Sequence, residues 1–142
     1  MARRKPAPGT KYYTPGEANA ALPLVRAIVR DIAELAPALF EQRRRLEGHD
    51  PGGDDLWSEE LRQVRNEYER DHDRMMEYVE ELAKLGVEIK DPQTGLVDFP
   101  CWMGNREVCL CWRLGEDEVA HWHEIDAGFA GRQQLNITAP SR

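Results

Sequence analysis

The sequence predicts an α+β fold, in which a long antiparallel helical hairpin is followed by a small antiparallel β-meander of three or four strands. Two observations support this prediction: apolar residues recur at helical spacing as far as Leu85, and apolar and polar residues alternate after it. Gly86 lies where the helical spacing ends and the alternation begins, and glycine is typical of a helix end. With 142 residues, the chain has the length of a single domain.

The first helix is expected over residues 14–47. Thr14, followed three residues later by Glu17, is typical of a capping box at a helix start. An apolar seam then repeats every seventh residue, with Gln42 as its polar exception. Pro37 lies inside this pattern and lacks an amide hydrogen, so a kink or a break is expected just before it.

The second helix is expected over residues 54–85, after a loop at residues 48–53. Its apolar seam consists of Trp57, Leu61, Val64, Tyr68, Met75, Tyr78, Leu82 and Leu85. Asp71 is the charged exception in this seam. A register-setting role for Asp71, or a place on a solvated face, is favoured over a metal site with His72 and Asp73, because consecutive helical residues point about 100° apart.

The two helices are too long for the small C-terminal part to cover. Uncovered apolar surface on the hairpin predicts self-association, as a homodimer that pairs the helices in a coiled-coil bundle. Leu82 is expected to lie in that interface, so the substitution Leu82→Asp is expected to break the assembly.

The β region is expected over residues 87–132, before a C-terminal tail at residues 133–142. The strand candidates are residues 87–89, 96–99, 106–112 and 119–124, and turn residues separate them. All three cysteines lie in this region. An odd number of cysteines is not typical of a disulfide framework, so free thiols are expected.

The net charge of −7 argues against a nucleic-acid partner, because phosphate binding needs a basic surface. The basic cluster at residues 2–5 is assigned to a flexible tail over residues 1–11. No apolar run has the length of a membrane span or a signal peptide, so no membrane partner is expected and a cytoplasmic location is predicted.

Several phrases of the sequence carry a resemblance. KDPQTGLVDFP, VCLCWRLGE and WHEIDAGFAGR, with YYTPGEANAALP near the start, resemble the family called domain of unknown function 2203. The resemblance extends from Tyr12 to about Leu135. It implies an uncharacterised, soluble bacterial protein with helices followed by a small β region, and it implies no activity. The matching positions are Asp98, Cys111, Trp112, Gly115, Glu116, Trp122, His123, Gly128, Phe129 and Arg132, and they include neither Cys109 nor His121.

Cys109 and Cys111, with His121 and His123, are the candidate metal ligands. Residues two apart on a strand share a face, and thiolate and imidazole are the usual zinc ligands. A hairpin loop of two residues would turn the cysteines away from the histidines. A loop of three residues would place all four on one face, with Cys111 opposite His123. The spacing C-x-C is unusual for zinc, so no cofactor is predicted, with zinc or another divalent metal as the alternative.

His123, Glu124 and Asp98 are the best candidates for catalysis, because histidine titrates near neutrality and a neighbouring carboxylate can orient its ring. The structural alternative is that His123 only packs and that Asp98 accepts hydrogen bonds from turn amides.

Arg132, Glu116, Asp126 and Cys111 are the candidate ligand-binding residues, since arginine can bind a carboxylate or phosphate at two points. The structural alternatives are that Glu116 accepts from turn amides, that Arg132 pairs with an acid across the dimer interface, and that the thiols fill the strand core. Core roles are likewise expected for the tryptophans and for Phe129.

The leading interpretation is a non-catalytic oligomeric scaffold or ligand-binding module with a polar patch around His123. The rival is a small metal-assisted hydrolase or lyase using His123, Glu124 and Asp98, and a further alternative is a structural zinc protein. A concave pocket between sheet and helices would favour the enzyme, whereas buried, fully paired polar groups would favour the non-catalytic module.

Overall fold

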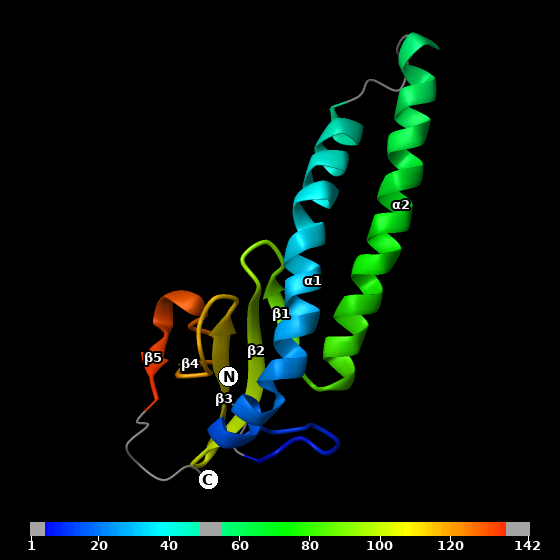
Figure 1. Ribbon diagram of the computed structural model, residues 1–142. Helices are drawn as coiled ribbons and strands as arrows, with labels where there is room; N and C mark the ends of the chain where they lie inside the picture. Colours follow the sequence, from blue (N-terminus) through cyan, green and yellow to red (C-terminus); the bar gives the residue numbers. More distant parts are fainter. Residues whose placement is uncertain (1–4, 49–54, 136–142) are drawn as a thin grey trace.

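In this computed structural model, two long helices form an antiparallel hairpin that leads into a five-stranded antiparallel sheet (Figure 1). Helix α1 spans Pro15–Glu47 and helix α2 spans Asp55–Lys84. The structure describes residues 5–48 and 55–135. The expected loop at residues 49–53, the cap at residue 54, the Trp57 side chain and the tail from residue 136 lie outside the described part. The predicted α+β architecture is confirmed.

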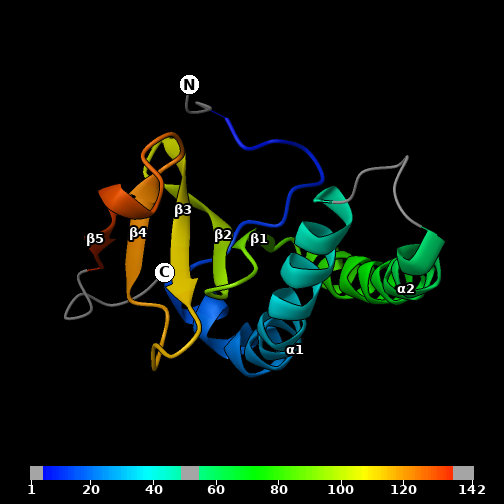
Figure 2. The same ribbon diagram turned by 90° about the horizontal axis from the view of Figure 1, so that it is seen from above.

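The predicted capping box begins α1. The Thr14 side chain accepts a hydrogen bond from the Glu17 amide at 3.1 Å, and the Glu17 carboxylate accepts one from the Thr14 amide at 3.0 Å. A kink or a break was expected near Leu35. The helix continues to Glu47 without a break, and Figure 2 shows it curved. Ala36, which is 6% exposed, packs into the core beside Pro37. This packing holds the helix together despite the lost hydrogen bond.

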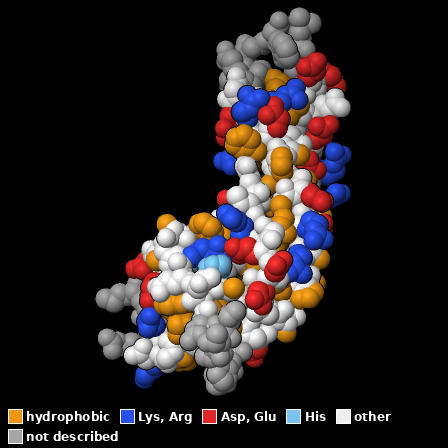
Figure 3. Space-filling model, turned by 60° about the vertical axis from the view of Figure 1, so that its left-hand side comes forward, with side chains coloured by type: hydrophobic (Ala, Val, Ile, Leu, Met, Phe, Trp, Pro, Cys, Tyr) orange, Lys and Arg blue, Asp and Glu red, His pale blue; other side chains and the backbone are white. Residues whose placement is uncertain are grey.

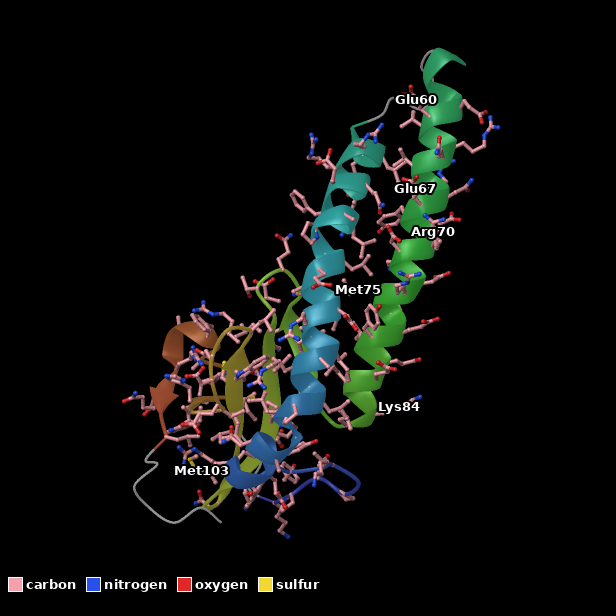
Figure 4. The ribbon with its side chains drawn as sticks, viewed as in Figure 1. Glu60, Glu67, Arg70, Met75, Lys84 and Met103 are labelled. Carbon is pink, nitrogen blue, oxygen red and sulfur yellow. The ribbon has the colours of Figure 1, made fainter. Side chains whose placement is uncertain are left out.

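The apolar seam of α2 faces α1 within the same chain. Val64, Met75 and Leu82 are 5%, 8% and 0% exposed. In Figure 4 the side chains of α2 divide between this buried face, where Met75 lies, and an exposed face that carries Arg70. The expectation that Leu82 lies in a dimer interface is therefore wrong, because α1, α2 and the sheet enclose it together.

The polar exceptions of the two seams meet each other. The Gln42 side-chain amide of α1 donates a hydrogen bond to the Asp71 carboxylate of α2 at 2.9 Å. A polar pair at one level of an apolar interface favours one alignment of the two helices, because any shift would bury both groups unpaired. This hydrogen bond is consistent with the register-setting role expected for Asp71.

The sheet has the strand order β1-β2-β3-β4-β5, and each neighbouring pair is antiparallel. The strands are β1 (Glu88–Asp91), β2 (Leu96–Met103), β3 (Arg106–Arg113), β4 (His121–Glu124) and β5 (Gln133–Gln134). Strand β5 lies in the segment that the sequence predicted to be a tail. It was not predicted because a strand of two residues leaves no alternating pattern in the sequence.

Helix α1 lies along one face of the sheet, and neither helix covers the opposite face (Figure 2). The face toward α1 is apolar: Val97, Phe99, Leu110 and Trp112 are each 0% exposed. Because successive strand residues point to opposite faces, this packing turns their polar neighbours to the face of the sheet away from α1. The Trp112 indole donates to the Glu116 carbonyl at 3.0 Å, which satisfies its polar group.

Candidate functional site

The face of the sheet away from α1 carries the cysteines and histidines predicted as metal ligands. Cys109 lies opposite His123, and Cys111 lies opposite His121. All four therefore share one face, as the three-residue loop predicted. The pairing itself differs from both alternatives, because residues 114–120 connect the two strands in a longer excursion.

Three buried side chains converge on this face, which we call the sheet-face centre: Asp98 of β2, Cys111 of β3 and His123 of β4. Asp98 and Cys111 are directly opposite each other across the β2–β3 pair. One ligand atom from each of the three residues lies within 4.8 Å of the other two. Asp98, Cys111 and His123 are only 5%, 0% and 2% exposed. The centre thus gathers a carboxylate, a thiol and an imidazole away from water.

Hydrogen bonds orient the His123 ring. Its Nδ1 lies 2.7 Å from the carbonyl oxygen of Glu124, and because a carbonyl only accepts, Nδ1 carries a hydrogen and donates it. The other ring nitrogen, Nε2, lies 3.0 Å from the Asp98 carboxylate. Ligating histidines are commonly oriented in this way, with one nitrogen bonded to a carbonyl and the other facing the metal. Nε2 is thus directed at the centre.

The thiols on this face are weak nucleophiles in the metal-free chain. Burial raises the pKa of Cys111 to about 12, and the charge of Asp98 raises it too, while the guanidinium of Arg132 opposes the change. Burial likewise raises the pKa of Cys109 to about 12, again with a contribution from Asp98. Both thiols are therefore protonated near neutral pH, whereas the thiolate is the reactive form of a cysteine.

The geometry also disfavours His123 as a general base for Cys111. A cysteine nucleophile needs a histidine with one nitrogen on the thiol and the other on an orienting group. Here the two nitrogens of His123 are engaged by the Glu124 carbonyl and by Asp98. The arrangement fits a ligand cluster better than a catalytic triad.

Glu124 does not join the centre through its side chain. It lies opposite Val108, which packs in the core, so its carboxylate is on the face toward the helices. There it accepts two hydrogen bonds from the Arg106 guanidinium, at 3.0 and 2.6 Å. Asp126, another predicted ligand residue, is exposed.

Arg132 forms a second polar group beside the centre. Its guanidinium donates to the Glu116 carboxylate at 2.8 Å and lies 3.0 Å from Nδ1 of His121. Glu116 also accepts the Arg113 amide at 2.9 Å, as expected of a turn acceptor. Burial acts to raise the pKa of Glu116, but these hydrogen bonds outweigh it and lower that pKa below its usual value.

Arg132 pairs with Glu116 of its own chain, and a further pair across a dimer interface stays a prediction. The expectation that Phe129 enters the core is wrong, because Phe129 is 40% exposed. Its ring lies against two guanidinium groups, 4.7 Å from Arg132 and 5.1 Å from Arg113. The cause is the short 3-10 helix at Phe129–Gly131, which keeps the segment at the edge of the sheet.

A cleft with a volume of ≈ 270 Å³ lies elsewhere, between α1, α2 and the β1–β2 turn. The residues that line it are Ala36, Leu39, Phe40, Arg43, Tyr68, His72, Met75, Asp91, Pro92 and Gln93. None of the three residues of the sheet-face centre is among them. The cleft and the candidate centre are therefore separate features.

Sequence reasoning chose Asp98 as a catalytic candidate and missed it as a ligand partner of Cys111. The signal was present in the alternation around it, since Val97 and Phe99 are apolar and Asp98 must face the other way. Its neighbour across the sheet depends on the β2–β3 register, in which Met103 pairs with Arg106 across a tight turn. Counting back from that turn gives Asp98 opposite Cys111.

Comparisons with known proteins agree with the resemblance of the sequence. Neither the comparison with curated proteins nor that with solved structures gave a match. In the part of the chain that the structure describes, no helix has the length and apolar character needed to cross a membrane. The model of the family described as "Uncharacterized conserved protein (DUF2203)" matches residues 11–135, and the chain therefore belongs to this family.

Proposed function

We propose that this protein is a ligand-binding module whose ligand is a divalent transition metal of the zinc class, bound at the sheet-face centre. The observation that carries the proposal is the convergence of Asp98, Cys111 and His123, whose ligand atoms lie within 4.8 Å of one another. Ligand atoms around a tetrahedral zinc ion are roughly 3.5 Å apart. Metal binding would therefore require the three side chains to rotate so that these atoms approach one another.

The chemistry of the three groups supports a metal of this class. Thiolate and imidazole favour zinc and its neighbours over magnesium or calcium, which prefer oxygen ligands alone. In the metal-free chain a proton lies between Nε2 of His123 and the Asp98 carboxylate, which are 3.0 Å apart. A metal ion would take the place of that proton and would convert the Cys111 thiol to thiolate.

Binding of the metal to purified protein tests the proposal. The untagged chain is treated with a chelator, dialysed, and titrated with Zn²⁺ by calorimetry, and native mass spectrometry then counts metal ions and subunits together. We expect one ion per chain. Replacement of His123 by Ala should weaken binding at least 100-fold, since loss of a supporting partner alone costs about 10–100-fold.

His121→Ala is the matched control. His121 lies on the same strand and the same face, but it contacts Arg132 and is not one of the three converging residues. We expect this variant to bind Zn²⁺ like the unaltered protein. Absence of binding by the unaltered protein would refute the proposal. Equal losses in both histidine variants would instead favour the site of two cysteines and two histidines predicted by spacing.

The metal-assisted hydrolase or lyase is the weaker candidate. Asp98 and His123 are buried and hydrogen-bonded to each other, and Glu124 is paired with Arg106 on the other face. Buried, paired polar groups are typical of a non-catalytic site. The cleft between the helices and the β1–β2 turn is lined by none of the three residues of the centre, so it does not give a substrate access to the proposed metal.

Self-association through the helices stays a prediction. The hairpin extends beyond the sheet, and Phe40 and Met76 on it are 59% and 49% exposed. Figure 3 shows apolar side chains scattered among charged ones along this part of the surface. Sedimentation velocity over a range of concentrations measures the assembly. A chain that remains monomeric at all concentrations would rule out the homodimer.

A further inference from the structure

Cys109 lies next to the sheet-face centre but is not one of its three converging residues. It occupies the same face of β3 as Cys111, two residues away, and it is directly opposite His123 of β4. Side chains directly opposite on antiparallel strands have Cβ atoms about 5 Å apart, and one metal ion can bridge such a pair. The position of Cys109 on the backbone is thus suitable for a ligand to the same ion.

The surroundings of the Cys109 thiol also connect it to the centre. Asp98 is directly opposite Cys111 across the β2–β3 pair, and it contributes to the raised pKa of both Cys111 and Cys109. The sulfur of Cys109 lies outside the group of three atoms that converge within 4.8 Å. Rotation of its side chain would bring it in, and Cys109 has room to rotate because it is only half-buried.

We propose that the Cys109 thiolate joins the sheet-face centre as its fourth ligand and closes the coordination shell of a zinc-class ion. This inference rests on the proposed metal binding and deepens it. Four protein ligands are typical of structural zinc sites, whereas catalytic sites keep one position open for water or substrate. The closed centre therefore ties β2, β3 and β4 together and does not act on a substrate.

Cobalt substitution counts the sulfur ligands. Co²⁺ is added to the metal-free protein, and the near-ultraviolet charge-transfer absorption from thiolate to cobalt is compared among variants. Cys109→Ser and Cys111→Ser should each remove about half of this absorption and weaken binding at least tenfold. Cys109→Ala serves as a second variant. Cys101→Ala is the matched control, since Cys101 is buried in the core on the opposite face of the sheet and should leave the spectrum unchanged.

Azide provides an independent readout, because it binds an open cobalt position and changes the visible spectrum. We expect no change with azide in the unaltered protein and a change in Cys109→Ala, where one position is vacant. If Cys109→Ser and Cys109→Ala keep the full charge-transfer absorption while Cys111→Ser loses all of it, the fourth-ligand inference is wrong and three-ligand binding stands. If Co²⁺ does not bind the unaltered protein at all, the proposed function fails as well.

Discussion

Removal of Asp98 tests how much the buried pair with His123 stabilises the fold. The two side chains are 3.0 Å apart and only 7% and 3% exposed. Replacement of one partner of such a pair leaves the other buried without compensation, which costs about 3–5 kcal/mol. A domain has about 5–15 kcal/mol of stability in total, so Asp98→Ala should remove a large part of it. The midpoint of thermal unfolding should fall by about 10 °C.

Urea unfolding followed by circular dichroism, in the presence of a chelator, measures this free energy without any contribution from metal. Asp31→Ala is the matched control, because Asp31 is exposed on α1, and its effect should stay within about 0.5 kcal/mol. Asp98→Asn keeps a hydrogen-bonding group and should lose only about 1 kcal/mol, yet it removes the carboxylate ligand and should abolish Zn²⁺ binding.

The double variant Asp98→Ala, His123→Ala completes a thermodynamic cycle. Because neither polar side chain remains buried without its partner, its loss should be smaller than the sum of the two single losses by about 2 kcal/mol or more. A loss within 0.5 kcal/mol for Asp98→Ala, or strict additivity in the double variant, would show that the pair does not stabilise the fold in the way its burial implies.

Three further predictions concern the stability of the fold away from the centre. Leu82→Ala should lower the free energy of unfolding by about 3 kcal/mol in urea titrations, with an unchanged sedimentation coefficient, because Leu82 is 0% exposed inside the chain. Gly95→Ala should destabilise the fold more than Gly104→Ala in the same assay. Both glycines have positive φ, so both substitutions strain the backbone. A Cβ at Gly95 would lie 2.7 Å from Cβ of Leu114, whereas a Cβ at Gly104 would meet nothing within 4 Å. Burial raises the pKa of the Cys101 thiol to about 11, whereas a thiol in an unfolded chain has a pKa of about 8.5. Between these two pH values the unfolded chain loses the thiol proton and the folded chain keeps it. The stability that the buried thiol contributes is therefore complete below pH 8.5 and is lost as the pH rises to about 11. Cys101→Ala should accordingly lose less stability than the unaltered protein between pH 8.5 and 11, and equal slopes would contradict this account.

The start of the first helix and the buried faces of both helices could be predicted from the sequence, because they depend on residues close together in the chain. The capping box needs only Thr14 and Glu17, three residues apart, and both of its hydrogen bonds form. The seams identified the inner faces of both helices, and their polar exceptions Gln42 and Asp71 meet as partners. What the seams did not reveal was that each helix finds its cover within the same chain, since periodicity identifies a buried face and not the surface that buries it.

The candidate centre shows the same division. Alternation along each strand puts Cys109 with Cys111 on one face, and His121 with His123 on one face. Whether the two pairs share that face depends on the register between the strands. The residue types limit the chemistry to thiol, imidazole and carboxylate. Register is a property of two strands together, so the length of the connection at residues 114–120 decided which cysteine faces which histidine.

The sequence by itself determined the fold class, the helix start and the segment that carries the polar chemistry, because each depends on residues close together in the chain. Only the tertiary structure decided that Asp98 joins Cys111 and His123, while His121 turns to Arg132 and Glu124 to Arg106. These partners come from different strands, and their distances are set by strand pairing and by packing on α1. A single sequence has no local signal for such distances.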